Sequence, residues 1–434
     1  MIRLRIKNFG PIGPGLSEND GWIDFKRVTV FIGNQGAGKS TVAKLFSSFS
    51  WIEKALVRGD YEKKWFERKG RMKSQFLSYH RLENYLEAGT RGSVEIEYEG
   101  NACTIRYVDG QLNITKFTHQ QTASADGQQA ELNITELTHQ EYALPQVMYV
   151  PAERNFISYV RNPRELKLSS ESLKEFLTSF DQAKESLRGA LKLPINDSEI
   201  EYDRLNDILN IRGPGHKVRL TDASSGFQSF VPLYLVSEYL AGTVQKKSQD
   251  RQELMSTGEA ERFKKEVESI FTNDALTEEQ KRVALSVLSA RFNKTAFINI
   301  IEEPEQNLFP SSQWEILKSL LTFNSQGLHN RLILTTHSPY IVNYLSLAIQ
   351  GKYLQQRIIE RGRQELLPKL DAIVPSQALL GADDVAIYQC SERDGSITRL
   401  PSFEGIPSDQ NLLNDWLRTG NELFDKLLEL EEAI

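Results

Sequence analysis

The segment from Gly33 to Ser40 reads Gly-Asn-Gln-Gly-Ala-Gly-Lys-Ser, which matches the pattern G-x-x-x-x-G-K-S/T of a phosphate-binding P-loop. Before it, the β-branched and aromatic run 28–32 predicts a buried strand. After it, apolar residues at helical spacing predict a helix. In a strand–loop–helix unit of this kind, the glycines let backbone N–H groups point at a polyphosphate, and the helix N-terminus adds its positive dipole. The chain is therefore expected to fold as an α/β protein.

The side chains of the P-loop predict which parts of a bound nucleotide each residue would contact. Lys39 is expected to reach the β- and γ-phosphates of a nucleotide, and the Ser40 hydroxyl to hold Mg²⁺. ATP and Mg²⁺ are the expected cofactors. The candidate nucleotide-binding residues of this segment are Gly33, Asn34, Gly36, Gly38, Lys39, Ser40 and Thr41.

A second strand-like run ends in two acidic residues. Residues 295–301 are mostly apolar, Glu302 and Glu303 follow, and Pro304 cannot continue the strand. Paired with a P-loop, such carboxylates form a Walker B arrangement, in which one supports the metal ion and the next polarises the attacking water. The sequence predicts the metal position for Glu302 and the catalytic position for Glu303.

Two further segments fit the same kind of site. The apolar run 331–336 ends in His337, which is placed to contact the γ-phosphate or the attacking water. Its distance of 34 residues from Glu303 suits one more strand and its crossover helix. Ser224 and Gly226 lie in a small-residue turn before an apolar helical run, and such a turn offers another anion-binding N-terminus.

The order of P-loop, Ser-Ser-Gly turn, acidic pair and strand-end histidine resembles the ABC-type ATPases, which include transporter motors, Rad50, SMC proteins and the OLD nucleases. The resemblance implies a β-rich nucleotide lobe and a helical lobe. It also implies that two subunits sandwich two ATP molecules. Ser224 and Gly226 then match the signature motif, which contacts the γ-phosphate held by the partner subunit. Residues 152–154 fall where the Q-loop region of the family lies.

Residues 6–10, 149–154 and 302–305 more closely resemble the soluble ABC-type ATPases of bacterial phage-defence loci, and most of all the ATPase subunits of PARIS systems. That resemblance implies a homo-oligomer, at least a dimer and further a ring such as a hexamer. It also implies a separate Toprim-type effector nuclease, which the ring holds inactive. An acidic phage protein that mimics DNA would trigger the release of this nuclease. The alternatives are a Septu-type ATPase that works with an HNH nuclease, a Rad50-like DNA-repair clamp, and a transporter motor.

The chain departs from the usual ABC pattern at three places. Glu302 stands where transporters carry Asp, so contact with Mg²⁺ is expected to run through water. Phe227 stands where the signature carries Gln or Glu, and residues 306–310 replace positions where relatives show histidines. Slow turnover suited to a switch is the expectation.

Four segments are expected along the chain. Residues 1–159 form the nucleotide lobe with the P-loop, a basic helical segment and a β-arm, and residues 160–294 form a mostly helical lobe with the signature. Residues 295–374 return to the core, and residues 375–434 form a hairpin, with Asp394 and Gly395 at its turn, and a final helix. Since 97 residues follow His337 without a spaced acidic triad, no Toprim nuclease domain is expected.

Composition limits the remaining possibilities. A net charge of −6 gives no overall nucleic-acid footprint, and Cys103 and Cys390 suggest neither a disulfide framework nor a metal cluster. No apolar run reaches the roughly 18 residues of a membrane span, and the alternating start is not a signal peptide. A cytoplasmic protein without membrane partners is expected.

Two local features carry weaker hypotheses. Residues 51–81 contain nine Lys or Arg and four Asp or Glu, with aromatic residues between them. This segment could bind nucleic acid or an acidic protein, or it could be a solvated helix whose aromatic side chains pack inward. We favour the solvated helix. The motif Leu-Asn-Ile-Thr recurs at 112–115 and 132–135, each time followed by Thr-His-Gln, which predicts a duplicated strand in a β-arm. His119 and His139 are too few for a metal site.

Overall fold

The structure, a computed structural model, describes residues 2–86, 92–116, 142–160, 168, 170–245, 257–272, 281, 288 and 294–432. Its centre is a seven-stranded sheet with the order β2-β16-β15-β4-β14-β13-β8. The five strands from β15 to β8 pair in parallel, and β16 pairs antiparallel with β15. The strands of this sheet are β2 (Gly15–Leu16), β4 (Val28–Gly33), β8 (Pro145–Val150), β13 (Ala296–Glu302), β14 (Arg331–Thr336), β15 (Val385–Cys390) and β16 (Ser396–Arg399).

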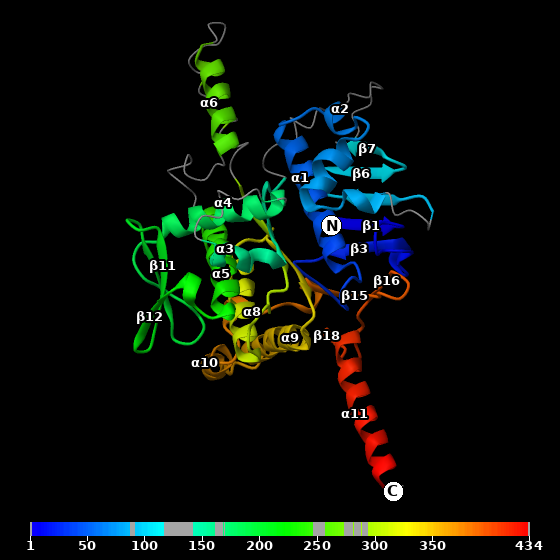
Figure 1. The fold of residues 1–434 in the computed structure, drawn as a ribbon, viewed down its shortest axis with the longest axis vertical. Helices are drawn as coiled ribbons and strands as arrows, with labels where there is room; N and C mark the ends of the chain where they lie inside the picture. The colour runs from blue at the N-terminus through cyan, green and yellow to red at the C-terminus, as the bar shows by residue number, and fades with distance from the viewer. Residues whose placement is uncertain are drawn as a thin grey trace.

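The central parallel strands are buried on both faces, which is why they consist of continuous apolar runs. Along β14, Leu332 and Leu334 belong to one core, and Ile333 belongs to the core on the other face. Helices α4, α5, α8 and α9 pack on the first face, and α1 packs on the second (Figure 1). Their bounds are α1 (Lys39–Arg58), α4 (Glu171–Ser186), α5 (Ser225–Gln245), α8 (Pro310–Ser325) and α9 (Pro339–Glu360).

A second, antiparallel sheet with the order β3-β1-β5-β6-β7 covers the outer side of α1. The alternation of apolar and polar residues predicted at the start of the chain is confirmed, since every second residue of β1 from Ile2 is buried. Between helix and sheet, the Phe25 and Phe46 rings stack with centroids 3.8 Å apart. The strands are β1 (Ile2–Lys7), β3 (Trp22–Phe25), β5 (Glu95–Glu99), β6 (Cys103–Val108) and β7 (Gln111–Lys116).

A third sheet corrects the expectation that residues 160–294 are mostly helical. Residues 191–219 form a four-stranded antiparallel sheet of order β12-β11-β10-β9. The signal was an alternating run at 199–202 with a turn after it, where the Asp203 carboxylate accepts the Leu205 and Asn206 N–H groups. The strands are β9 (Leu191–Lys192), β10 (Glu199–Asp203), β11 (Ile208–Gly213) and β12 (His216–Arg219).

The basic segment is helical only in part. Helix α1 ends at Arg58, and the chain continues through α2 (Lys63–Phe66), a π-helical turn at Met72–Leu77 and two short 3-10 turns, η3 (Ser78–His80) and η4 (Glu83–Leu86). Phe66 and Phe76 are buried in the core around α1. Their burial agrees with the predicted inward packing of the aromatic side chains in this segment.

The predicted C-terminal hairpin is confirmed, with β15 and β16 antiparallel and Gly395 in the left-handed conformation at φ 71°. A Cβ at Gly395 would come within 2.3 Å of the Pro11 carbonyl oxygen, so the turn is pressed against the N-terminal segment. Because β15 pairs directly with β4, residues after 375 complete the central sheet. Beyond it, α11 (Leu412–Glu432) points away from the rest of the chain (Figure 1).

The remaining short elements are α3 (Phe156–Tyr159), α6 (Thr257–Phe271), α10 (Leu367–Asp371), β17 (Ser402–Phe403) and β18 (Ile406–Pro407). Of the repeat, the first copy's residues 112–115 lie in β7, whereas His119, the whole second copy and His139 lie outside the described residues. Cys103 and Cys390 are both buried, and no disulfide joins them. In the part of the chain that the structure describes, no helix is long and apolar enough for a membrane span, and no cluster of three or more potential metal ligands occurs.

Candidate nucleotide-binding site

The P-loop connects β4 to α1, as the sequence predicts. Gly33, Gly36 and Gly38 all have positive φ angles, of 143°, 73° and 97°. At Gly33 glycine is also required by space, because a Cβ would come within 2.3 Å of the Cys390 carbonyl oxygen on the adjacent strand. Gly38 precedes the first turn of α1, so the loop ends on the helix N-terminus.

The side chain of Lys39 folds back over the loop. Its Nζ donates to the carbonyl oxygens of Gly33, at 3.0 Å, and Asn34, at 2.8 Å. Burial lowers the pKa of Lys39, and the nearby carboxylates oppose this shift. The ammonium thus lies at the mouth of the loop, held by two carbonyl oxygens that a phosphate group can replace.

The neighbouring loop and helix residues are also ordered by polar contacts or burial. The Asn34 side-chain oxygen accepts the Gln35 N–H at 2.8 Å. In the first turn of α1, Ser40 is half-buried, whereas Thr41 is buried at 4% exposure. The Ser40 hydroxyl is therefore the accessible one of the two.

The acidic pair lies at the end of β13, where the backbone turns sharply. Glu302 is the last strand residue, and its Oε2 accepts the Ala152 N–H at 3.1 Å, while its Oε1 lies 3.9 Å from Lys44 Nζ. Glu303 has a φ of 45°, an uncommon conformation for a residue with a side chain. Burial, and after it the charge of Glu302, raises the pKa of Glu303.

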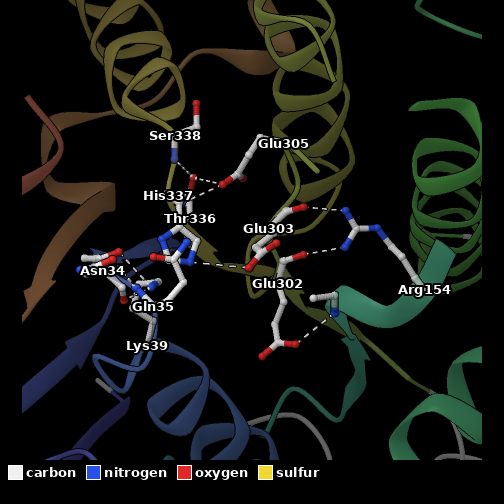
Figure 2. A network of polar contacts seen from close by, with 12 residues as sticks. Asn34, Gln35, Lys39, Arg154, Glu302, Glu303, Glu305, Thr336, His337 and Ser338 are labelled. Atoms are coloured by element: carbon white, nitrogen blue, oxygen red, sulfur yellow. Dashed lines mark hydrogen bonds and ion pairs between the residues drawn. The ribbon is translucent and has the colours of Figure 1, made fainter. Parts of the chain in front are cut away.

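His337 follows β14, the strand between β13 and β4. Its Nε2 lies 3.6 Å from Glu303 Oε1 (Figure 2). Burial, followed by the charge of Lys39, lowers the pKa of His337 below its usual 6.5, so the ring is neutral at pH 7. A neutral imidazole next to a carboxylate suits the orientation of water or of a phosphate oxygen.

Glu305 belongs to the site, although the sequence interpretation assigned it no role. Its Oε1 accepts the Thr336 hydroxyl and the His337 backbone N–H, both at 2.8 Å. Its Oε2 is buried and has no hydrogen-bond partner among the described residues. Glu305 therefore fixes the position of His337 through the backbone. The sequence signal was its place two residues after Glu303, across a proline.

Arg154 is the other residue whose role the sequence interpretation missed. Its fully buried guanidinium donates to the backbone oxygens of Glu302, at 2.7 Å, and Glu303, at 2.6 Å (Figure 2). Its Nε donates to the Ser229 carbonyl oxygen of α5 at 3.1 Å. One side chain thus ties the acidic pair to α5, the helix that begins at Ser225. The only sequence hint was its position in the Q-loop region.

The Ser-Ser-Gly segment lies at the start of α5, with Ser225 and Gly226 in the first turn of the helix. Ser224 is exposed just before α5, and no hydrogen bond of the described residues joins Ser224 or Gly226 to residues 33–41. Gly226 faces the loop after the acidic pair, since a Cβ there would come within 2.9 Å of the Asn307 carbonyl oxygen. Phe227, the unusual residue, packs against the apolar core.

The geometry therefore brings together three of the four predicted groups. The P-loop follows β4, the acidic pair follows β13 and His337 follows β14, so all lie at the carboxyl edge of neighbouring parallel strands. That edge is where α/β sheets bind ligands. Ser224 and Gly226 remain outside this cluster.

The sequence matches one family model, described as an AAA domain, over residues 3–306, which is more than two thirds of the chain. The match runs from β1 through the P-loop to the acidic pair. A comparison with the curated proteins found no match.

Several solved structures are similar at low sequence identity. An Smc head bound to the C-terminal winged-helix domain of ScpA is 11% identical, with a TM-score of 0.34 over 92% of this chain and 96% of that one. The SMC head domain from Thermotoga maritima is 13% identical, with a TM-score of 0.30 over 92% and 98%. A dimeric ATP-binding cassette in a post-hydrolysis state, bound to ADP and Pi, is 11% identical, with a TM-score of 0.24 over 93% and 100%. With TM-scores below 0.5, these likenesses do not decide the fold, which the sheet order and the family model establish.

Proposed function

Because the chain belongs to the AAA domain family, we propose that it is a cytoplasmic ATPase that binds ATP with Mg²⁺ at the P-loop and hydrolyses it slowly. The observation that carries the proposal is the convergence of Lys39, Glu303 and His337 at one sheet edge, with Glu303 Oε1 3.6 Å from His337 Nε2. A phosphate-binding loop beside a half-buried carboxylate of raised pKa is an arrangement suited to water activation.

The residues present suit a nucleotide with its metal ion. Ser40 and Glu302 offer hydroxyl and carboxylate oxygens, which are the ligands Mg²⁺ prefers, and Glu302 is held in place by the Ala152 N–H. When bound, the ion neutralises charge on the phosphates. Glu302 would support the ion at the position where transporters carry Asp.

The remaining roles follow from the positions of the side chains. Lys39 exchanges the carbonyl oxygens of Gly33 and Asn34 for phosphate oxygens. Glu303 accepts a hydrogen bond from the attacking water, and the neutral imidazole of His337 contacts the γ-phosphate oxygens or that water. Since Glu305 holds the His337 backbone, it keeps the imidazole aimed at the site.

The site is completed by a second copy of the chain. Ser224 is exposed, and no hydrogen bond among the described residues joins it to its own P-loop, as expected if Ser224 and Gly226 contact a nucleotide held by the partner. The half-site within one chain then binds ATP, and only a pair of chains hydrolyses it.

A mixing experiment tests this arrangement. Lys39→Ala removes the phosphate lysine and leaves the turn intact, while Ser224→Arg blocks the turn and leaves the P-loop intact. Each variant alone should be inactive. A mixture should regain ATPase activity, because the mixed pair contains one site with an intact P-loop and an intact turn. Recovery of no activity, with both variants folded, would contradict the shared site.

We also propose a biological role for this ATPase, that of a scaffold and sensor in anti-phage defence, which holds a separate Toprim-type nuclease until an acidic phage protein appears. One support is the sequence of residues 6–10, 149–154 and 302–305, which resembles that of the ATPases of phage-defence loci. The other is a group of exposed cations that suit an acidic partner: Lys63, Lys64, Arg68 and Lys69.

Co-expression of the tagged chain with its neighbouring genes, followed by mass spectrometry of co-purifying proteins, tests this role. A Toprim-type nuclease in a large complex supports it. An HNH nuclease supports the Septu-type alternative instead. Purification without a protein partner, together with ATP-dependent binding to DNA ends, supports a Rad50-like clamp and rejects the scaffold.

A further inference from the structure

Helix α11 exposes an unusual amount of apolar surface. From Asp415 onward nearly every residue is exposed, and none of the 21 residues is buried. Six large side chains are between 56% and 65% exposed: Trp416, Leu417, Leu423, Phe424, Leu427 and Leu430. A helix of this length is only marginally stable alone in water, and this one contains Gly420. The apolar stripe therefore needs a partner surface.

The spacing of the stripe indicates what that partner is. Leu413, Trp416, Gly420, Leu423, Leu427 and Leu430 follow one another at alternating steps of three and four. This is the a and d pattern of a coiled-coil heptad, whose seam pairs with a copy of itself. Gly420 at a central a position leaves room for the Trp416 ring of a facing helix. Leu417 and Phe424 fall at e positions, beside the seam, and widen the apolar face.

The charges of α11 agree with pairing between copies. In this register Lys426 is a g residue and Glu431 is the e residue of the next heptad, and these two positions meet across a parallel pair. The acidic residues Asp415, Glu422, Asp425, Glu429 and Glu432 fall at c and f positions, on the outer face. Pairing would therefore bury the apolar stripe, form two interchain ion pairs and leave the excess negative charge in water.

The size of the stripe is sufficient for a stable pair. The six exposed side chains present on the order of 800 Å² of apolar surface, about what each partner contributes to an interface of standard size. The base of the helix is firmly attached, because the Leu412 N–H donates to the Gln389 side chain at 2.9 Å and Asn411 caps the first turn. Gln389 is paired with Ile32, next to the P-loop.

We propose that α11 pairs with α11 of a second copy of this chain, in a parallel coiled coil that forms without nucleotide. This interface is separate from the shared ATP site. If the proposed ATP sandwich also forms, each chain has two different two-fold interfaces. Copies joined alternately by two such interfaces close into rings with an even number of chains, or extend as filaments. That last step rests on the proposed function, whereas the α11 pair does not.

The mass of the full chain in EDTA without nucleotide, measured by light scattering after gel filtration, tests the pair. Wild type should be a dimer. Leu423→Glu puts a charge in the seam and should weaken the dimer on the order of a hundredfold or more. The matched control Asn421→Glu adds the same charge two residues away on the opposite face, and should remain a dimer. Both variants should bind ATP like the wild type, since α11 lies outside the P-loop, so a failure here is distinct from a failure of the proposed function.

Charge exchange tests the register. Lys426→Glu and Glu431→Lys should each weaken the pair, and the double variant should restore it. A monomeric wild type at tens of micromolar, or equal masses for Leu423→Glu and a dimeric wild type, would overturn the proposal. So would a wild type that is monomeric when pure and binds another protein through α11. Failure of the double exchange to restore the pair would overturn the parallel register.

Discussion

At the scale of single residues, the P-loop lysine carries the sharpest prediction. Lys39 Nζ binds two loop carbonyl oxygens at 2.8 and 3.0 Å, so the backbone of the loop is shaped around the lysine ammonium. Lys39→Ala should abolish measurable ATP binding in a titration with a fluorescent ATP analogue. The fold should persist, because the Lys39 side chain, although buried, binds loop carbonyl oxygens and is not part of the apolar core. Normal ATP affinity in this variant would remove the P-loop assignment.

Glu303 should separate binding from hydrolysis. Glu303→Gln keeps the shape and loses the basic carboxylate, so turnover should fall by about 10²–10⁴-fold with little change in ATP affinity. The variant should therefore accumulate as an ATP-bound assembly, visible by light scattering in the presence of ATP and Mg²⁺. Glu302→Gln serves as a comparison, because it should weaken the Mg²⁺ dependence instead. Unchanged turnover in Glu303→Gln would place the base elsewhere.

The pH dependence should report the same carboxylate. The pKa of Glu303 is raised from 4.5 by burial and then by Glu302, and a base must be ionised. ATPase activity should therefore fall as pH drops through a midpoint above 4.5, and this limb should vanish from the residual activity of Glu303→Gln. Ionisation at a raised pKa also costs folding stability, so Glu303→Gln should gain stability relative to wild type as pH rises through that pKa. A midpoint at or below 4.5 would contradict the burial of this group.

At the scale of secondary-structure elements, Arg154 joins β13 to α5. Its guanidinium satisfies backbone oxygens of Glu302, Glu303 and Ser229, and it holds Glu303 in a left-handed conformation. Burial lowers the pKa of Arg154 to about 10, so it stays charged at neutral pH. Arg154→Met should leave these oxygens unsatisfied and lower the free energy of unfolding by about 2–5 kcal/mol.

Arg154→Lys is the informative companion variant, because it keeps the charge and loses the planar fork. It should fold better than Arg154→Met, yet lose ATPase activity through misplacement of Glu303. Denaturant unfolding and single-turnover hydrolysis distinguish the two effects. Wild-type kcat in Arg154→Lys would mean that the conformation of Glu303 does not depend on the fork.

At the scale of the whole molecule, the two parts of the C-terminal segment have different roles: its strands complete the central sheet, whereas the end of α11 is exposed. Strand β15 lies directly beside β4, the strand that carries the P-loop, and a Gly33 contact closes the junction. Removal of residues 375–434 exposes the edge of the central sheet and should give an aggregated chain without ATP binding. Removal of residues 415–434 deletes only the exposed part of α11, so ATP binding should remain while nucleotide-free pairing disappears. Gel filtration and ATP titration of both truncations test this contrast.

Much of the site could be predicted from local sequence, since a P-loop, an acidic pair and a strand-end histidine each carry their chemistry in a few neighbouring residues. Sequence also predicted the N-terminal strand and the C-terminal hairpin, where alternation and a turn signal coincide. The sheet at residues 191–219 was missed, because its strands are two to six residues long and lie within a segment with helical composition. Short strands depend on pairing with distant partners, which local pattern does not reveal.

The sequence by itself determined an α/β protein with a phosphate-binding loop, one candidate metal-supporting carboxylate and one candidate catalytic carboxylate, because backbone freedom at glycine and charge at strand ends are local properties. Only the tertiary structure decided which groups meet. It placed Glu303 beside His337, positioned both through Glu305 and Arg154, and set β15 into the central sheet. These outcomes depend on contacts between residues tens to hundreds of positions apart, where burial and hydrogen bonding of distant groups outweigh local preference.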